Sequence, residues 1–254
     1  MEATRPTDVQ CGIDSPPQSS IVCHVIVRCA LALVSATTLV HAAPLRALAW
    51  DEDIAARDLA LVSGASSAKL QDLHPTKRTG PLPVKRSAAM FIRALDKPAL
   101  PDKQPCQIAC NVPESFTHPL IVLLPDDDHP TGLRILVVDD NPAGFKWGSH
   151  RFINTTPKPL LIRLENRVVN IPSGWKPVDV SLEGGTRGIP VLIALEEDSD
   201  KPLYSAVWEH NTDVRTLCFL VPGTDARESP VAFKSIPEDR LVLEFEAKAV
   251  REQE

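Results

Sequence analysis

The sequence predicts an all-β protein: an antiparallel β-sandwich, immunoglobulin-like or jelly-roll-like, preceded by an N-terminal signal peptide. Many short apolar runs of roughly six to nine residues recur about every ten residues. Clusters of Gly, Pro, Asn and Asp separate these runs, which is typical of turns between strands. No internal repeat is evident, which counts against propellers and β-helices. An apolar fraction of 43% in 254 residues excludes a wholly disordered chain.

Residues 1–42 are predicted to be a leader and signal peptide. The uncharged apolar run from Cys29 to Val40 follows Arg28, and the small residues up to Ala42 suit a cleavage site. The run of about a dozen residues is short for a membrane-spanning helix and long enough for a signal peptide. The alternative is an N-terminal anchor that is never cleaved. Either alternative predicts export to the periplasm or the cell exterior, and cleavage would leave no membrane span.

Residues 43–248 are predicted to form a single β-sandwich domain, and residues 249–254 a frayed tail. The Pro-rich segment 96–113 marks a possible subdivision, with a long crossover inside one sandwich preferred over a linker. Before that segment, Asp51 is a candidate N-cap for a short helix near residues 50–53. A strand, with a helix as competitor, is expected at 57–64; further edge-type strands are expected at 67–75 and 81–86, and a strand or helical turn at 88–95.

After residue 118 the strand pattern becomes regular. The run 215–221 is apolar on both faces over most of its length, which predicts a central strand of a sheet. The predicted strands are 120–125, 133–138, 149–154, 160–166, 167–172, 176–182, 189–195, 203–209, 215–221, 230–236 and 240–248.

Charge and cysteine content narrow the functional classes. A formal net charge of −6 without clustered Lys and Arg argues against nucleic-acid binding. Three cysteines remain after the predicted cleavage. Cys106 and Cys110 would lie about 13 Å apart in a strand, too far for a disulfide, whereas a turn would let them close. Cys218 lies in an apolar run and is predicted to be a buried, inert thiol.

Three tryptophans and two polar residues are the candidate ligand-binding residues. Trp147, Trp175 and Trp208 would form an aromatic platform for sugar rings or peptides, together with Tyr204, or else fill the core. His150 and Arg151 are the polar side chains to consider first in the segment 145–180, with a structural role as the alternative.

Two acidic loops are the candidate metal site. Oxygen-rich loops at one end of a sandwich suit calcium, which needs six or more oxygen ligands. The alternative is a pair of solvated turns, because Asp and Asn favour turn geometry by themselves. No cofactor is predicted. The candidate ligands are Asp126, Asp127, Asp128, Asp139 and Asp140.

Catalytic patterns are sparse. The Gly-x-Ser-x-Gly motif, which places a nucleophilic serine on a sharp turn, is absent. A pair of carboxylates for glycoside hydrolysis would come together in space rather than in sequence, and Glu165, Glu209 and Asp213 lie at predicted strand ends. A carbohydrate-active or other hydrolytic enzyme is therefore the alternative function.

Residues 133–239 resemble an uncharacterised group of exported bacterial β-rich proteins. The resemblance lies in a Phe-x-x-Gly-x-x-Arg-Phe-x-Asn segment, in Arg215 on a late strand, and in an Ile-Pro-Glu-Asp end at 236–239. It implies no particular activity. The segment positions are Phe145, Gly148, Arg151, Phe152 and Asn154.

The function expected from these observations is non-enzymatic: binding or assembly at the bacterial cell envelope. The expected partner is an envelope protein or a glycan. An exposed tryptophan beside two carboxylates would instead favour the hydrolase.

Overall fold

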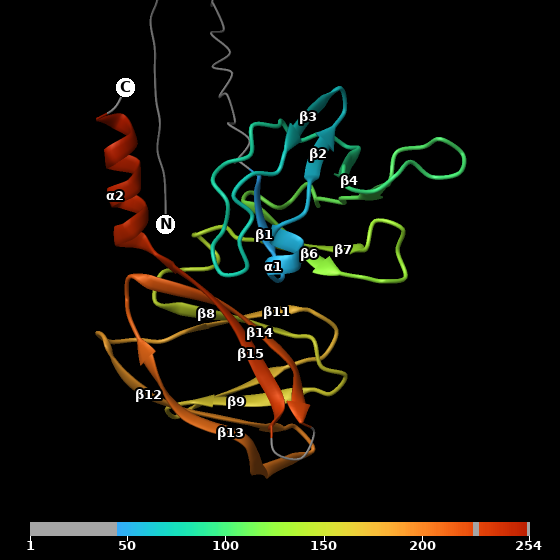
Figure 1. Cartoon of the computed structure of the whole chain (residues 1–254). Helices are drawn as coiled ribbons and strands as arrows, with labels where there is room; N and C mark the ends of the chain where they lie inside the picture. The colour runs from blue at the N-terminus through green and yellow to red at the C-terminus, as the bar shows by residue number, and fades with distance from the viewer. Residues whose placement is uncertain (1–44, 226–228, 253–254) are drawn as a thin grey trace, which may run out of the picture. The chain divides into compact units, whose positions relative to one another are not determined.

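Four β-sheets make up the part of the chain that the structure, a computed structural model, describes: residues 45–225 and 229–252 (Figure 1). The prediction of an all-β, sandwich-type protein is confirmed. The predicted signal peptide at 1–42 lies outside the described residues.

The first half of the described chain supplies two sheets and a short helix. One sheet has the strand order β3-β2-β4-β5 and the other β1-β6-β7. The predicted N-cap is confirmed, because Asp51 Oδ1 accepts the Ile54 N–H at 2.9 Å. The elements are β1 (Arg46–Ala49), α1 (Glu52–Ala55), β2 (Leu59–Ser63), β3 (Ser66–Lys69), β4 (Met90–Ala94), β5 (Gln107–Ala109), β6 (Pro119–Pro125) and β7 (Leu133–Asp139).

The second half forms a sandwich of two four-stranded sheets, ordered β10-β9-β12-β13 and β11-β8-β14-β15. As predicted, the strand at 215–221 is central, with β8 on one side and β15 on the other. The strands are β8 (Ser149–Asn154), β9 (Leu160–Leu164), β10 (Arg167–Ile171), β11 (Pro177–Ser181), β12 (Arg187–Leu195), β13 (Asp198–His210), β14 (Val214–Asp225) and β15 (Ser229–Asp239).

Side chains that alternate along the central strands divide the apolar core among three layers. On β6, Ile121 and Leu123 pack with β2 and β4, whereas Leu120, Val122 and Leu124 pack with β8, β14 and β15. The same alternation on β14 sends Leu217 and Phe219 toward β6, and Cys218 and Leu220 toward β9 and β12. A strand buried on both faces has a continuous apolar sequence, which is why the sequence pattern predicts both of these strands.

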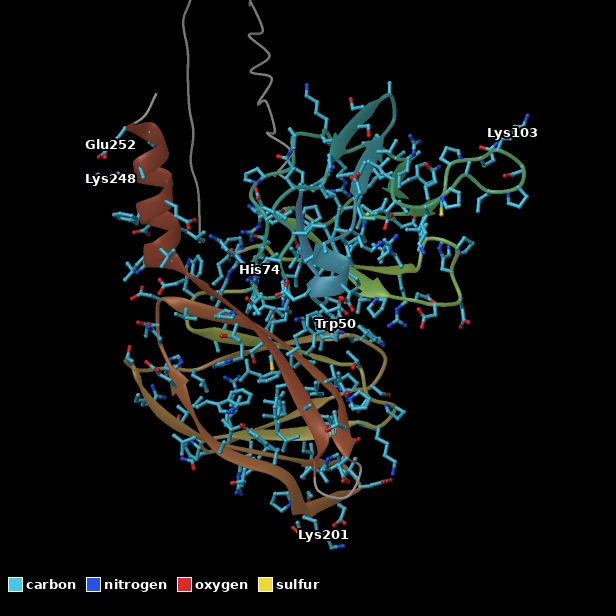
Figure 2. All side chains as sticks on the ribbon, in the orientation of Figure 1. Trp50, His74, Lys103, Lys201, Lys248 and Glu252 are labelled. Carbon is cyan, nitrogen blue, oxygen red and sulfur yellow. The ribbon has the colours of Figure 1, made fainter. Side chains whose placement is uncertain are left out.

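Two strand pairings are parallel, β1 with β6 and β8 with β14. The other pairings are antiparallel, as predicted. Trp50, labelled in Figure 2, directly follows β1 and packs edge-on against Phe219 of β14, with ring centroids 5.2 Å apart. The start of the described chain therefore packs against the sheet β11-β8-β14-β15.

The strand predicted over residues 240–248 is wrong, because these residues form helix α2 (Arg240–Arg251). Alternating Leu241, Leu243 and Phe245 imitate a strand, but Leu, Glu, Ala and Lys are strong helix formers. Asp239 Oδ1 accepts the Leu241 N–H at 2.8 Å and so caps the first turn. Of the residues predicted to form a frayed tail, 249–254, residues 249–251 belong to α2, and residues 253–254 lie outside the described residues.

The described helices are all too short or too polar to cross a membrane. Lys248 in the last turn of α2 pairs with Glu252, the residue after the helix: Lys248 Nζ lies 3.8 Å from Glu252 Oε1, and Figure 2 labels both residues. Such an exposed pair adds only a few tenths of a kcal/mol to the helix.

Two predicted edge strands are largely irregular. The strand expected at 67–75 is confined to β3, and residues 81–86 form no strand. The prolines that suggested an edge position instead prevent ladder hydrogen bonding at these places.

The prediction that Cys106 and Cys110 form no disulfide when a strand separates them holds. Cys106 and Cys110 flank β5, and neither they nor Cys218 is disulfide-bonded. Burial raises the pKa of the Cys218 thiol to about 12, so this thiol is inert at neutral pH.

Candidate functional site

The segment that carries the Phe-x-x-Gly-x-x-Arg-Phe-x-Asn pattern forms a corner of the fold. Phe145 is buried, and its ring is covered by the guanidinium groups of Arg151 and Arg215, whose carbons lie 4.5 and 5.0 Å from the ring centroid. Arg215 also stacks on Trp147, at 4.9 Å. Cation–π contacts are stronger where the groups are buried than where they are exposed to solvent. The aromatic side chains here hold arginines in place.

The polar residues of the same segment are bound internally. Arg151 makes a two-point ion pair with Asp179, with N–O distances of 2.6 Å, and also donates to the Asp139 carbonyl. Asn154 donates to the carbonyls of Lys158 and Ile171, at 2.8 and 3.2 Å. Arg151, a predicted ligand-binding residue, is 7% exposed, and each of its three guanidinium nitrogens donates a hydrogen bond within the protein.

Gly148 is the one residue of this corner whose backbone requires glycine. Its φ is +74°, and a Cβ placed on it would lie 3.3 Å from Thr212 Cα. Left-handed backbone costs an L-residue about 1–2 kcal/mol.

We expect Gly148→Ala to lower the free energy of unfolding by about 1–3 kcal/mol, because strain and a tight contact add. Gly185→Ala is the control, since nothing lies within 4 Å of its added Cβ and its φ is ordinary. Urea unfolding of both variants measures the difference, and equal midpoints would contradict the strain at Gly148.

A buried ion cluster adjoins the corner. It joins three arginines to two carboxylates, and four of its five side chains are at most 7% exposed. Asp140 Oδ2 accepts from Arg46, Arg78 and Arg215 at 2.5, 2.9 and 3.2 Å. Glu238 accepts from Arg46 at 2.6 Å and from Arg215 Nε at 2.7 Å. The cluster therefore ties β1 and the loop at Arg78 to β14 and β15.

The candidate metal ligands do not converge. Asp140 belongs to the ion cluster, Asp139 accepts the His118 N–H at 3.1 Å, and Asp126 accepts the Asp128 N–H at 3.2 Å. Across the described residues, no three His, Cys, Asp or Glu side chains are grouped as metal ligands. The calcium site, with Asp127 as its remaining member, stays a prediction that this arrangement does not support.

The three candidate tryptophans occupy three different places. Trp147 stacks under Arg215 in the corner, and Trp175 stacks under Arg134, whose guanidinium carbon lies 4.6 Å from the ring centroid. Trp208 lies on β13, in the sandwich that the second half of the chain forms. The structure does not bring the three tryptophans together into one platform, and Arg side chains cover two of them.

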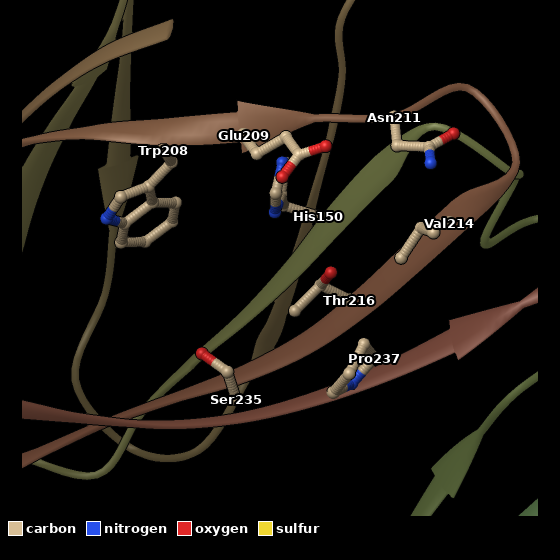
Figure 3. A pocket seen from close by; sticks show the side chains of 8 residues that line it. All are labelled: His150, Trp208, Glu209, Asn211, Val214, Thr216, Ser235 and Pro237. Atoms are coloured by element: carbon tan, nitrogen blue, oxygen red, sulfur yellow. The ribbon is translucent and has the colours of Figure 1, made fainter. Parts of the chain in front are cut away.

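Trp208 and His150 line one cavity of about 500 Å³ between β13 and the paired strands β14 and β15 (Figure 3). In Figure 3, the side chains of Trp208 and Glu209 come from β13 on one side of the cavity, and Thr216 of β14 and Ser235 of β15 lie opposite them. Two of the five predicted ligand-binding residues thus meet, although 58 positions separate them in the sequence. The remaining lining residues, which the sequence did not single out, are Asn211, Val214 and Pro237.

Aromatic rings hold Trp208 in position. Its Nε1–H donates to the Tyr204 hydroxyl at 3.0 Å, and its ring lies edge-on to Phe233 with centroids 5.6 Å apart. Phe152 and His150 complete the cluster, at 6.2 and 5.8 Å. The indole N–H is satisfied within the protein, so what Trp208 offers to the cavity is apolar ring surface.

His150 is neutral at physiological pH. Burial, and secondarily the nearby His210, lower the pKa of its imidazole from the ordinary value to about 4. His150 Nδ1 and His210 Nε2 are buried without a hydrogen-bond partner among the described residues. Two buried histidine rings thus lie close to each other, with exposed fractions of 7% for His150 and 1% for His210.

Carboxylates do not pair in this cavity. Glu165 is held by Arg187, with N–O distances of 2.8 and 3.0 Å, and Asp213 accepts from Arg240. Of the three carboxylates considered for hydrolysis, Glu209 alone lines the cavity. Glycoside hydrolysis by the usual route needs a second carboxylate, about 5–10 Å from the first.

No protein-family model matches this chain, and no curated protein matches it. The resemblance to exported bacterial β-rich proteins therefore stays a prediction.

Proposed function

We propose that the protein is an exported, non-enzymatic binding module of the bacterial cell envelope, and that it binds a glycan unit in the cavity between β13 and β14/β15. The observation that carries the proposal is this cavity, where the predicted residues His150 and Trp208 meet. Binding sites of this kind combine apolar surface with a few convergent polar groups.

The chemistry of the lining supports a hydroxyl-rich ring as ligand. The indole of Trp208 and the side chains of Val214 and Pro237 provide apolar surface for the C–H faces of a sugar. Glu209, Asn211, Thr216 and Ser235 provide acceptors and donors for its hydroxyl groups. A purely apolar ligand would leave these polar groups without partners, at a cost of about 1–3 kcal/mol for each that becomes buried.

The charge of the lining supports a neutral ligand. His150 is uncharged at neutral pH, and Glu209 is the one formally charged side chain among the eight lining residues. The cavity is therefore weakly anionic, which disfavours uronic and sialic acids and anionic lipids.

Binding is favoured over the alternative, hydrolysis, because the other two carboxylates considered are ion-paired away from the cavity. A hydrolase of this chain would need a catalytic partner for Glu209 from outside the lining. The export that the envelope location requires comes from the sequence of residues 1–42 and is part of the proposal.

A glycan-array screen of the protein, with a parallel pull-down from an envelope fraction, tests the proposal. We expect retention on neutral oligosaccharides of glucose, galactose or N-acetylglucosamine, and none on acidic ones. Trp208→Ala should weaken the binding at least about tenfold, since loss of a central aromatic contact commonly costs more than 1.4 kcal/mol.

Trp175→Ala is the matched control, because Trp175 is also half-buried but lies outside the cavity. Equal losses in the two variants would place the binding elsewhere. Failure to retain any glycan or envelope component would remove the support for a binding module.

A further inference from the structure

In the described part of the chain, no strand is hydrogen-bonded to the outer edge of β13, which ends the sheet β10-β9-β12-β13. Strand β13 is the longest strand in the described part of the chain, with 13 residues, and it pairs with β12 on one side only (Figure 1). An open edge exposes unpaired N–H and C=O groups that can pair with another chain unless proline, charge or a bulge protects it.

Residues that hinder pairing with another strand occupy only the first part of β13, before Leu203. Residues 198–202 carry two aspartates, Lys201 and Pro202, and the register against β12 shifts there; Figure 2 labels Lys201 in this part. From Tyr204 to His210, β13 pairs with β12 in a regular register, and this part of β13 contains no proline or lysine. By contrast, β15, an edge strand of the facing sheet, carries Pro230, Lys234 and Pro237.

The backbone of Val207 points to this open edge. Val207 lies opposite Pro190 in the ladder, and the Pro190 carbonyl accepts the Glu165 N–H at 2.9 Å, on the β9 side. Residues of an antiparallel pair alternate between facing each other and facing away. Val207 therefore directs its N–H and C=O away from β12, and so do Ser205 and Glu209, two positions on either side. The Val207 side chain is 72% exposed.

We propose that two copies of this chain associate by antiparallel pairing of their β13 edges about a two-fold axis at Val207. The occupant of the edge is a second copy because the sequence is self-complementary about this axis. Val207 meets Val207 of the partner on the outer face. Polar Ser205 faces the partner's Glu209, and on the inner face small Ala206 faces the partner's bulky Trp208.

This register satisfies the free backbone groups. Ser205, Val207 and Glu209 each exchange an N–H and a C=O with the residue opposite, which gives six backbone hydrogen bonds across the two-fold axis. The two sheets that contain β13 become one continuous sheet of eight strands. No like charges lie directly opposite each other between Tyr204 and His210.

Val207→Lys tests the pairing without touching the cavity lining. Light scattering after gel filtration of the full chain should give a concentration-dependent mass approaching twice that of the single chain, and the variant should stay at the single-chain mass. Val168→Lys is the matched control: it places the same charge on a valine 60% exposed, on β10 at the opposite edge of the same sheet. This control should still dimerise.

Val207→Cys gives a second, positive readout. Residues opposite each other in a hydrogen-bonded antiparallel pair have Cα atoms about 5.5 Å apart, which suits a disulfide. Mild oxidation should link this variant into a dimer more completely than wild type or Val168→Cys.

A wild-type protein that stays monomeric over the whole concentration range would overturn the proposal. So would a dimer that survives Val207→Lys, or one that Val168→Lys abolishes equally.

Discussion

Replacing Arg215 with methionine is expected to lower the free energy of unfolding by about 3–5 kcal/mol. Arg215 is 2% exposed and lies between the carboxylates of Asp140 and Glu238. It also donates to the carbonyls of Asp140 and Phe145, at 2.9 and 3.1 Å. Its removal leaves two buried carboxylates with less compensation and takes a donor from each of two carbonyls, and each loss is costly in a buried site.

Arg240→Met is the control for this variant. Arg240 also pairs with an aspartate, Asp213, but its side chain is 46% exposed, so solvent screens the pair and its loss should cost much less stability than the loss of Arg215. Urea unfolding monitored by tryptophan fluorescence compares the two. If both variants lost the same stability, the cluster would not hold the sheets together.

Acid is expected to destabilise the protein by about 3 kcal/mol through Glu238 alone. Burial raises the pKa of this carboxyl, but Arg78, Arg46 and Arg215 outweigh burial and lower it to about 2, from an ordinary value of 4.5. The unfolded chain therefore takes up the proton first as the pH falls. The stabilisation is complete above pH 4.5 and is lost as the pH falls toward 2.

His150 adds a separate effect at higher pH. Because the folded pKa of about 4 lies below the ordinary 6.5, the unfolded chain binds this proton first as well. Stability should begin to fall below pH 6.5 and continue to fall down to about pH 4.

Unfolding free energies measured from pH 7 to pH 2 separate these two groups. His150→Gln should flatten the curve between pH 6.5 and 4, and Glu238→Gln should flatten it between 4.5 and 2, whatever each does to the stability at pH 7. A wild-type curve that is level from pH 4.5 to 2 would contradict the ion pairing of Glu238.

Local patterns predicted most strands, since a strand buried on both faces, such as β6 or β14, reads as an apolar run. They failed at α2, where alternating Leu241, Leu243 and Phe245 imitate a strand although Asp239 caps a helix. The ion cluster had no local pattern at all, because Arg46 and Glu238 are 192 positions apart. Which charges meet is decided by sheet packing, and in particular by the parallel pairing of β1 with β6.

The candidate site was half predictable for a similar reason. Residue type alone pointed to His150 and Trp208, whereas Thr216 and Ser235 are ordinary strand residues that only the meeting of β14, β15 and β13 brings to the cavity. Arg151 was equally prominent in the sequence, yet its pairing with Asp179 makes it structural. Arginine and tryptophan occur both in ligand-binding sites and in protein cores, so residue type alone does not distinguish the two roles.

The four tryptophans of the chain allow a direct test of the claim that the cavity, rather than the Phe145–Asn154 corner, is the binding site. In the ¹⁵N-tryptophan-labelled protein, each indole N–H gives one NMR signal, which single Trp→Phe variants assign. On titration with a neutral oligosaccharide retained on the array, the Trp208 signal should move while those of Trp147 and Trp175 stay in place. A shift of the Trp147 or Trp175 signal with an unchanged Trp208 signal would contradict the assignment of the site.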